Sequence, residues 1–293
     1  MGAELNEILN RLKEKGLPLS VLSPSFKEEP LETGSFSLKE STDTPVPVGV
    51  PDIDAHLLDQ GLRSGATHEF IPESFADYPA ALGFLLAMAG RTYGLEKRPF
   101  IWCASGKGAD RPSLPYPYGL LNMGLSADDL LCVQVESERD MLWVLEEALS
   151  APSRPHVIGL YPAAEKMHDF TASRRLSLRC EKNQTRLFLL HHHSMMSVGG
   201  STAAATRWTI KTTPSAAVFY SNSKTPSMGP PRWHVSLTQC KRGRPGSWKL
   251  EWDYETLSFH LVSPLAHRTL ATRAEKRRTQ LATGARKRLS GRN

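Results

Sequence analysis

Between residues 48 and 190, short apolar runs alternate with amphipathic stretches, a pattern that predicts strands alternating with helices. Short apolar runs bounded by turn residues are typical of strands that are buried on both faces. The runs that predict strands are 67–71, 99–103, 130–135, 156–161 and 185–190, and the stretches that predict helices are 79–93, 137–149 and 170–182. This order indicates a parallel sheet with helices on both faces.

The pattern changes after Ser194. Apolar and polar residues now alternate, which predicts strands with one face on a core and the other towards water. These stretches are 207–213, 232–240, 247–253 and 257–262. The turn residues of 241–246 predict a hairpin between two of them. We therefore expect an α/β fold whose mostly parallel sheet, flanked by helices, is extended by antiparallel strands in the C-terminal half.

Both ends of the chain differ from this middle part. Residues 1–16 place Leu5, Ile8, Leu9 and Leu12 on one stripe, which predicts a short amphipathic helix. Residues 17–47 are rich in Pro, Ser, Thr and Glu without a sustained period and are interpreted as a linker. The compact domain is assigned to 48–263 and a tail to 264–293. The apolar stripe of the first helix docks either on a partner subunit or on the chain's own body.

The net charge of +6 comes from the tail. Of the 36 basic and 30 acidic residues, nine basic residues and one acidic residue lie in 264–293, so the rest of the chain is slightly acidic. A basic tail attracts nucleic acid or an acidic protein surface. The candidate binding residues, chosen on charge alone, are Arg273, Lys276, Arg277, Arg278, Arg286, Lys287 and Arg288.

The composition argues against several protein classes. No apolar run reaches the roughly 18 residues that a membrane-spanning helix needs, and the N-terminus lacks the features of a signal peptide. The four cysteines contain no CxxC pair, so neither a zinc site nor a disulfide framework is expected. We expect a cytoplasmic protein without a metal or cofactor.

The turn after Ile71 is the first candidate ligand site, because open α/β sheets bind ligands beyond the carboxyl ends of their strands. A phosphate-binding loop has two glycines, then a lysine and a Ser or Thr that binds Mg²⁺. Here Ile71 and Ala76 replace the glycines, Asp77 the lysine and Tyr78 the metal ligand. Two unit charges about 4 Å apart interact by about 4 kcal/mol at an effective dielectric constant of about 20, so Asp77 opposes triphosphate binding.

Motifs between residues 48 and 262 resemble RecA-type recombinases and, within that superfamily, the ImuA family of bacterial mutagenesis cassettes. The RecA-like segments are 62–65 and 118–134, and the ImuA-like segments are 142–149, 171–176, 204–208, 231–233, 244–248 and 251–252. The sequence Arg244-Pro245-Gly246-Ser247-Trp248 is the most specific of these. The resemblance leaves both ends of the chain uncovered and implies a RecA-like core.

The resemblance also implies where the other hydrolytic residues would lie. RecA-like enzymes have a water-orienting Glu after the second core strand, where this chain has Ser105, and a metal-binding Asp where it has Tyr161. Together with the altered loop, three requirements for phosphoryl transfer are absent, so we expect no enzyme activity. The loop after Leu190, which begins with His191, His192 and His193, is interpreted as a plain connection and not as a DNA-contacting loop.

The function implied by the resemblance is that of a non-catalytic accessory protein of translesion DNA synthesis in the damage-inducible SOS response. Its implied partners in the mutasome are ImuB, a relative of Y-family polymerases, and an error-prone replicative-type DNA polymerase. RecA, and DNA through the basic tail, are further implied partners, and no membrane is involved. The alternatives are an active RecA-type ATPase or recombinase, and a cell-division inhibitor of the SulA type.

Overall fold

The computed structural model describes residues 10–14, 20–22, 44–107, 114–161, 169–195, 201–218 and 225–262. The chain divides into a body, residues 1–260, and a C-terminal part, Leu261–Asn293. Within the described ranges, no helix combines the length and hydrophobicity that crossing a membrane requires. The predicted basic tail and most of the predicted linker lie outside the described residues.

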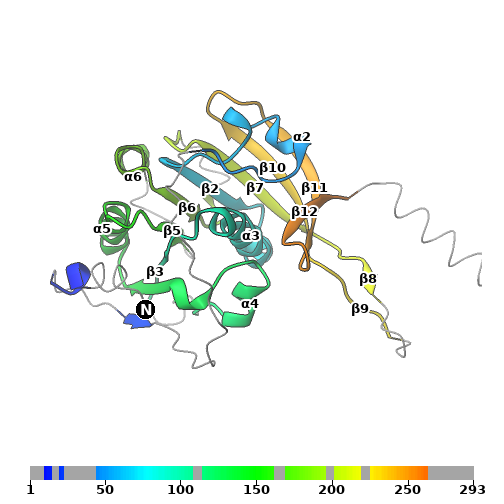
Figure 1. The fold of residues 1–293 in the computed structure, drawn as a ribbon, viewed down its shortest axis with the longest axis horizontal. Helices are drawn as coiled ribbons and strands as arrows, with labels where there is room; N and C mark the ends of the chain where they lie inside the picture. Colours follow the sequence, from blue (N-terminus) through cyan, green and yellow to red (C-terminus); the bar gives the residue numbers. More distant parts are fainter. Residues whose placement is uncertain are drawn as a thin grey trace, which may run out of the picture. The chain divides into compact units, whose positions relative to one another are not determined.

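A ten-stranded sheet forms the frame of the body (Figure 1). Its strands are β1 (Ser20–Leu22), β2 (Ala66–Pro72), β3 (Phe100–Ser105), β4 (Leu130–Val135), β5 (His156–Leu160), β6 (Arg186–Leu190), β7 (Thr206–Thr213), β10 (Arg232–Cys240), β11 (Gly246–Asp253) and β12 (Ser258–Leu261). They lie in the order β1-β4-β3-β5-β6-β2-β7-β10-β11-β12. The pairs from β4 to β7 are parallel, whereas β7, β10 and β11 pair antiparallel. The predicted fold class is confirmed. A separate hairpin, β8 (Ala217–Val218) and β9 (Ser227–Met228), lies between β7 and β10 in the chain.

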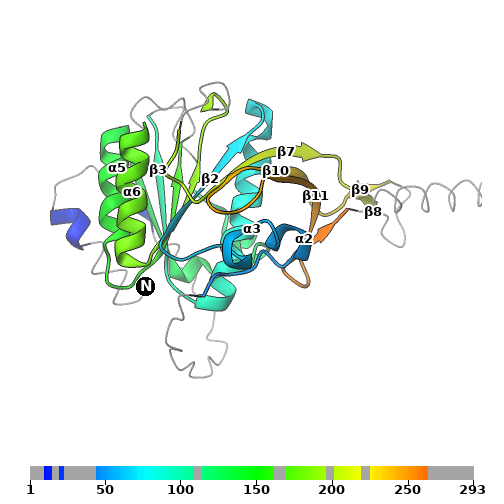
Figure 2. The same cartoon turned by 90° about the horizontal axis from the view of Figure 1, so that it is seen from above.

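Helices cover the two faces of the parallel half (Figure 2). The helices α5 (Glu138–Leu149) and α6 (Phe170–Asn183) pack on one face, and the long helix α3 (Tyr78–Glu96) packs on the other. The remaining short helices are α2 (Pro51–Asp54), α4 (Pro117–Leu121), η1 (Leu58–Gln60), η2 (Phe75–Asp77) and η4 (Ala127–Asp129). Side-chain caps set where the two outer helices begin: Ser137 Oγ accepts from the N–H of Asp140 and Asp169 Oδ1 from that of Ala172.

An aromatic core joins α3 to the antiparallel strands. Trp208, Trp233 and Trp252 are fully buried, and the ring of Phe84 lies 5.9 Å from that of Trp208 and 5.7 Å from that of Trp233. These tryptophans therefore anchor the core between α3 and the antiparallel strands. The opposite face of β7 and β10 carries partly exposed polar side chains. One-sided packing therefore explains the alternating pattern of the C-terminal half.

A glycine lets α3 approach the loop after α4 closely. A Cβ atom on Gly90 would lie 1.7 Å from the carbonyl oxygen of Met123, so only glycine fits there. The Trp252 indole N–H donates to the neighbouring carbonyl of Asn122 at 3.0 Å. These contacts fix α3, which begins at the candidate site, against both halves of the sheet.

The N-terminal segment packs on the body where it is described. Residues 10–14 are helical, Leu12 is fully buried in the cluster under α5, and Arg11 pairs with Glu147 at 2.7 Å. This packing favours the alternative in which the predicted amphipathic helix docks on its own body. The stripe residues Leu5, Ile8 and Leu9 lie outside the described residues.

The segment interpreted as a linker contains ordered structure that its composition did not reveal. Strand β1 pairs antiparallel with β4, with Val21 opposite Val133. Nearer the domain, Val46 is buried and forms a β-bridge with Leu62. The compact body therefore begins before residue 48, because three-residue strands and single bridges are too short to show a period in the sequence.

Candidate functional site

The carboxyl edge of the parallel strands holds the six residues predicted to form a degenerate nucleotide site. Ile71 lies inside β2 and is buried, Ala76 is exposed in the following loop, and Tyr78 is the first residue of α3. The strand, loop and helix thus follow one another as in a phosphate-binding unit. The conformation of the loop is different, because residues 75–77 form a turn of 3₁₀-helix.

The carboxylate of Asp77 closes this loop. Its Oδ2 accepts hydrogen bonds from the Ser74 hydroxyl at 2.6 Å and the Ser74 N–H at 3.1 Å. Its Oδ1 accepts from the N–H of Thr212 on β7 at 2.8 Å. Only 5% of the Asp77 surface is exposed. The side chain at the position of the phosphate-binding lysine therefore satisfies backbone donors within the protein.

The backbone donors of the loop are also engaged. The N–H of Glu73 donates to Ile210 at 2.9 Å, that of Ser74 donates to Asp77, and that of Asp77 donates to the carbonyl of Ser74 at 3.1 Å. A phosphate cradle needs such N–H groups to face the ligand. These three groups donate to β7 and to the loop itself, so none of them faces outward to a phosphate group.

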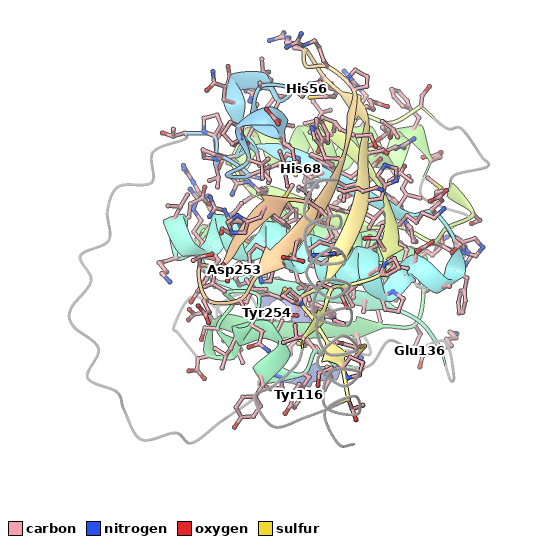
Figure 3. The ribbon with its side chains drawn as sticks, turned by 90° about the vertical axis from the view of Figure 1, so that its right-hand side faces the viewer. His56, His68, Tyr116, Glu136, Asp253 and Tyr254 are labelled. Carbon is pink, nitrogen blue, oxygen red and sulfur yellow. The ribbon has the colours of Figure 1, made fainter. Side chains whose placement is uncertain are left out.

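Ser105 ends β3 and is buried. The N–H of the next residue, Gly106, donates to Val135 at 3.0 Å, which continues the pairing of β3 with β4. The carboxylate of Glu136 is half exposed (Figure 3) and lies 3.4 Å from the ammonium of Lys107. Glu136 follows β4, one strand away from the predicted position, and its charge is paired.

Tyr161 directly follows β5, and 1% of its surface is exposed. Its ring stacks on that of His191, which follows β6, with centroids 5.8 Å apart and planes 4° from parallel. The N–H of Tyr161 donates to Leu190 and the N–H of His191 donates to Phe70, both at 2.9 Å. Two stacked aromatic rings therefore occupy the position at which RecA-like enzymes have a metal-binding Asp.

A buried polar cluster lies beside these rings and was not predicted from the sequence. Glu69 of β2 is fully buried, accepting hydrogen bonds from the Thr202 hydroxyl at 2.6 Å and from Arg207 Nε at 2.8 Å. His191 Nε2 lies 3.7 Å from the same carboxylate. Thr202 also bonds Ser173 of α6 at 2.9 Å. The cluster ties β2, β7 and α6 together. The only signal in the sequence was a polar triplet, Thr67 to Glu69, inside a buried strand.

Other predicted residues are dispersed. His192 and His193 have ring centroids 4.0 Å apart, whereas His191 is stacked on Tyr161. In the described part of the chain, no group of three or more potential metal ligands comes together. On α6, Arg175 and Arg179 pair with Glu146 of α5 at 2.5 and 3.1 Å. The tail residues Arg273, Lys276, Arg277, Arg278, Arg286, Lys287 and Arg288 lie outside the described residues.

Comparison with known proteins agrees with the ImuA-family resemblance found in the sequence. No protein-family model matches the chain. The chain is 31% identical over 256 residues to Protein ImuA of Caulobacter vibrioides strain NA1000 / CB15N, an alignment that covers 82% of this chain and 99% of that protein. Protein ImuA of Caulobacter vibrioides strain ATCC 19089 matches to the same extent. At this identity and coverage, the chain belongs to the ImuA family.

Proposed function

We propose that the chain is a non-catalytic accessory protein of DNA-damage-induced mutagenesis, and that it acts by binding partners. Family membership supports the process. The closed loop after β2 supports the non-catalytic role. The main observation behind this role is the hydrogen bond from the Thr212 N–H to Asp77. This contact places a carboxylate where a nucleotide-binding protein needs a cation, and it engages that carboxylate with backbone donors.

The partners in this proposal are ImuB and the error-prone replicative-type polymerase of the mutasome, with RecA and DNA as further ligands. A RecA-like body without nucleotide turnover still offers the surfaces of a fold that assembles with other proteins. The basic tail adds a charged segment that attracts acidic protein surfaces or the DNA backbone.

A nucleotide titration tests the non-catalytic role. The purified full-length chain is titrated with ATP in the presence of Mg²⁺, and binding is followed by calorimetry. We expect no saturable binding tighter than about 1 mM. Tighter binding, or ATP hydrolysis above that of a buffer control, would favour the alternative of an active RecA-type ATPase.

A genetic experiment tests the process. Cells that lack the gene are expected to show fewer mutations after DNA damage, and the intact gene restores the frequency. Purified ImuB from the same cells is expected to co-elute with the full-length chain. Unchanged mutation frequency, or filamentous growth on overexpression as expected for a cell-division inhibitor, would contradict the proposal.

A further inference from the structure

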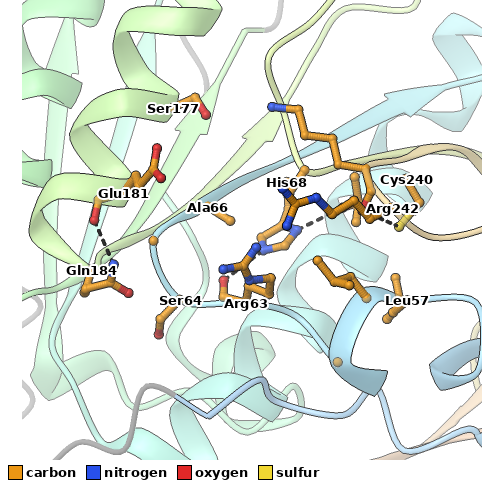
Figure 4. Close-up of a pocket in the computed structure, with 16 residues that line it drawn as sticks. Leu57, Arg63, Ser64, Ala66, His68, Ser177, Glu181, Gln184, Cys240 and Arg242 are labelled. Carbon is orange, nitrogen blue, oxygen red and sulfur yellow. Dashed lines mark hydrogen bonds between the residues drawn. The ribbon is translucent and has the colours of Figure 1, made fainter.

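A cavity of about 340 Å³ lies at the other end of β2, at the amino edge of the sheet (Figure 4). Its walls come from the loop before β2, the end of α6 and the turn that joins β10 to β11. Ala66 and His68 of β2 belong to its lining, whereas the degenerate nucleotide loop follows Pro72. The cavity is therefore separate from the degenerate nucleotide site at the carboxyl edge of the sheet.

Cationic side chains converge on this cavity. Arg63 reaches it from the loop before β2, and Lys241 and Arg242 reach it from the hairpin turn. Figure 4 shows the side chains of Arg63 and Arg242 beside the imidazole of His68. The guanidinium of Arg242 has no ion-pair or hydrogen-bond partner among the described residues. Arg63 has only a long contact of 3.8 Å with Asp59, and Lys241 donates to the carbonyl of Ala203.

The turn that carries these cations is held rigidly. His56 Nδ1 lies 2.9 Å from the carbonyl of Pro245, and the N–H of Arg244 donates to the carbonyl of His56 at 2.9 Å. The His56 ring also packs edge-on against Trp248 at 5.1 Å. Arg242 itself has a left-handed backbone with φ of 60°. The backbone from which the Arg242 side chain extends is therefore fixed before a ligand binds.

The floor of the cavity is fixed as well. His68 is buried between the Thr206 hydroxyl at 2.9 Å and the carbonyl of Arg63 at 3.3 Å. Gly65 has a φ of +68°, and a Cβ atom there would lie 3.0 Å from the amide group of Gln184. The loop before β2 therefore turns tightly against α6, which a residue with a side chain would oppose.

The Arg242 guanidinium has no carboxylate partner among the described residues, and that of Arg63 has only the long contact with Asp59, so both can still donate to the oxygens of an oxyanion. Glu181 lines the opposite wall, and Leu57 and Leu58 give the cavity an apolar side. A nucleic-acid backbone presents continuous negative charge without an apolar group beside it, so it leaves the apolar side formed by Leu57 and Leu58 without a partner. A single acidic side chain beside an apolar one, as a protein partner presents it, fits both features.

We propose that this cavity binds an acidic side chain of a protein partner through Arg63 and Arg242. The proposal rests on the proposed partner-binding function and deepens it, because it names the chemistry that the partner presents. It also places the working surface on the described body, in addition to the basic tail.

A peptide titration of the full-length ¹⁵N-labelled chain tests the cavity. The probes are the capped tripeptide acetyl-Ala-Glu-Leu-amide and its Gln counterpart, and the readouts are the backbone amide signals of Gly61 and Gly65. We expect saturable shifts with the Glu peptide and binding that is weaker by about tenfold or more with the Gln peptide. Equal binding of the two peptides would overturn the proposal.

Variants localise the binding. Arg63→Gln and Arg242→Gln are each expected to weaken binding of the Glu peptide by about tenfold. Lys249→Gln, which removes an exposed cation of β11 outside the cavity, leaves it unchanged. Matching denaturation midpoints identify variants that fold normally. Undiminished binding in the double variant Arg63→Gln/Arg242→Gln overturns the proposal. Stronger binding of inorganic phosphate or a short oligothymidylate at the same amides also overturns it, in favour of a phosphate ligand.

Co-elution with ImuB separates the two proposals. If wild type and the double variant bind ImuB equally well, the cavity is not the partner site, although the proposed function stands. If the Glu peptide binds and ImuB does not, the cavity is supported while the proposed partner is wrong. Loss of ImuB binding only in the double variant supports both.

Discussion

The carboxylate of Asp77 accepts a hydrogen bond from the backbone N–H of Thr212 at 2.8 Å, and this contact ties the loop after β2 to strand β7. The same side chain caps the 3₁₀ turn through Ser74. A residue that opposes phosphate by its charge is thus also a structural residue of this chain. These hydrogen bonds of Asp77 hold the loop in its defined shape.

Replacing Asp77 with alanine is expected to lower the free energy of unfolding by about 2 kcal/mol, because the cap and the acceptor for Thr212 are lost together. Urea denaturation monitored by tryptophan fluorescence measures the change. Ala76→Ser, at the exposed neighbouring position, is the control and leaves stability within about 0.5 kcal/mol. If Asp77→Ala were as stable as wild type, the hydrogen bonds of Asp77 would contribute nothing measurable to the free energy of unfolding.

Local patterns sufficed to predict most of the fold. The apolar runs that became β3, β4 and β5 and the cap residue Ser137 are read from neighbouring positions, because periodicity and capping are local. The substitutions at Asp77 and Tyr161 were also visible, since their positions follow predicted strands. The structural role of Asp77 could not be predicted, because its hydrogen-bond partner Thr212 is distant in the sequence.

Contacts between distant segments account for the rest. Glu69 meets Thr202 and Arg207 only because β2 and β7 are neighbours in the sheet. The cavity likewise joins Arg63 to Arg242, which are distant in the sequence. Strand β1 escaped prediction because three residues show no period.

A buried ion cluster at the amino ends of β5 and β6 is predicted to control stability. Arg186, whose side chain is fully buried, donates to both oxygens of Glu96 at 3.0 and 3.1 Å. Glu96→Gln leaves this guanidinium without its counter-charge, so we expect a loss of about 3–5 kcal/mol in the free energy of unfolding. Urea denaturation measures the loss in Glu96→Gln, and the exposed change Glu255→Gln is the control.

The paired replacement Glu96→Leu/Arg186→Met provides the decisive comparison. Removing both charges leaves no uncompensated ion, so the double variant is expected to be more stable than Glu96→Gln. A double variant less stable than Glu96→Gln would contradict this prediction, and its difference from wild type measures whether the ion pair is net stabilising relative to an apolar pair.

Two buried histidines are predicted to make the fold sensitive to mild acid. Burial lowers the pKa of His68 to about 3, and burial also places the pKa of His156 well below its usual value. Glu96 lies 3.4 Å from His156, but Arg186 already neutralises its charge. Below pH about 6.5 the unfolded chain takes up protons that the folded chain excludes, so stability falls as the pH drops.

Each histidine is expected to contribute a slope of about 1.4 kcal/mol per pH unit once the pH lies below the unfolded value. Urea denaturation between pH 7 and about 5 measures the combined slope. His68→Gln should remove one of the two contributions, and the exposed change His260→Gln should remove neither. A pH-independent stability across this range would contradict the burial of both imidazoles.

The four thiols are predicted to differ sharply in reactivity. Burial raises the pKa of all four thiols, to about 12 for Cys132 and Cys180, but Cys240 alone is partly exposed. Because the thiolate is the nucleophile, Ellman's reagent should modify Cys240 in the native chain and all four thiols only after denaturation. Cys240→Ser should abolish the native reaction.

Cys240 lines the cavity together with Arg63 and Arg242. The Glu tripeptide is therefore expected to slow the modification of Cys240, and the Gln tripeptide is expected to leave its rate unchanged. Rapid modification of a second thiol in the Cys240→Ser variant would show that the sheet opens more readily than its buried core implies.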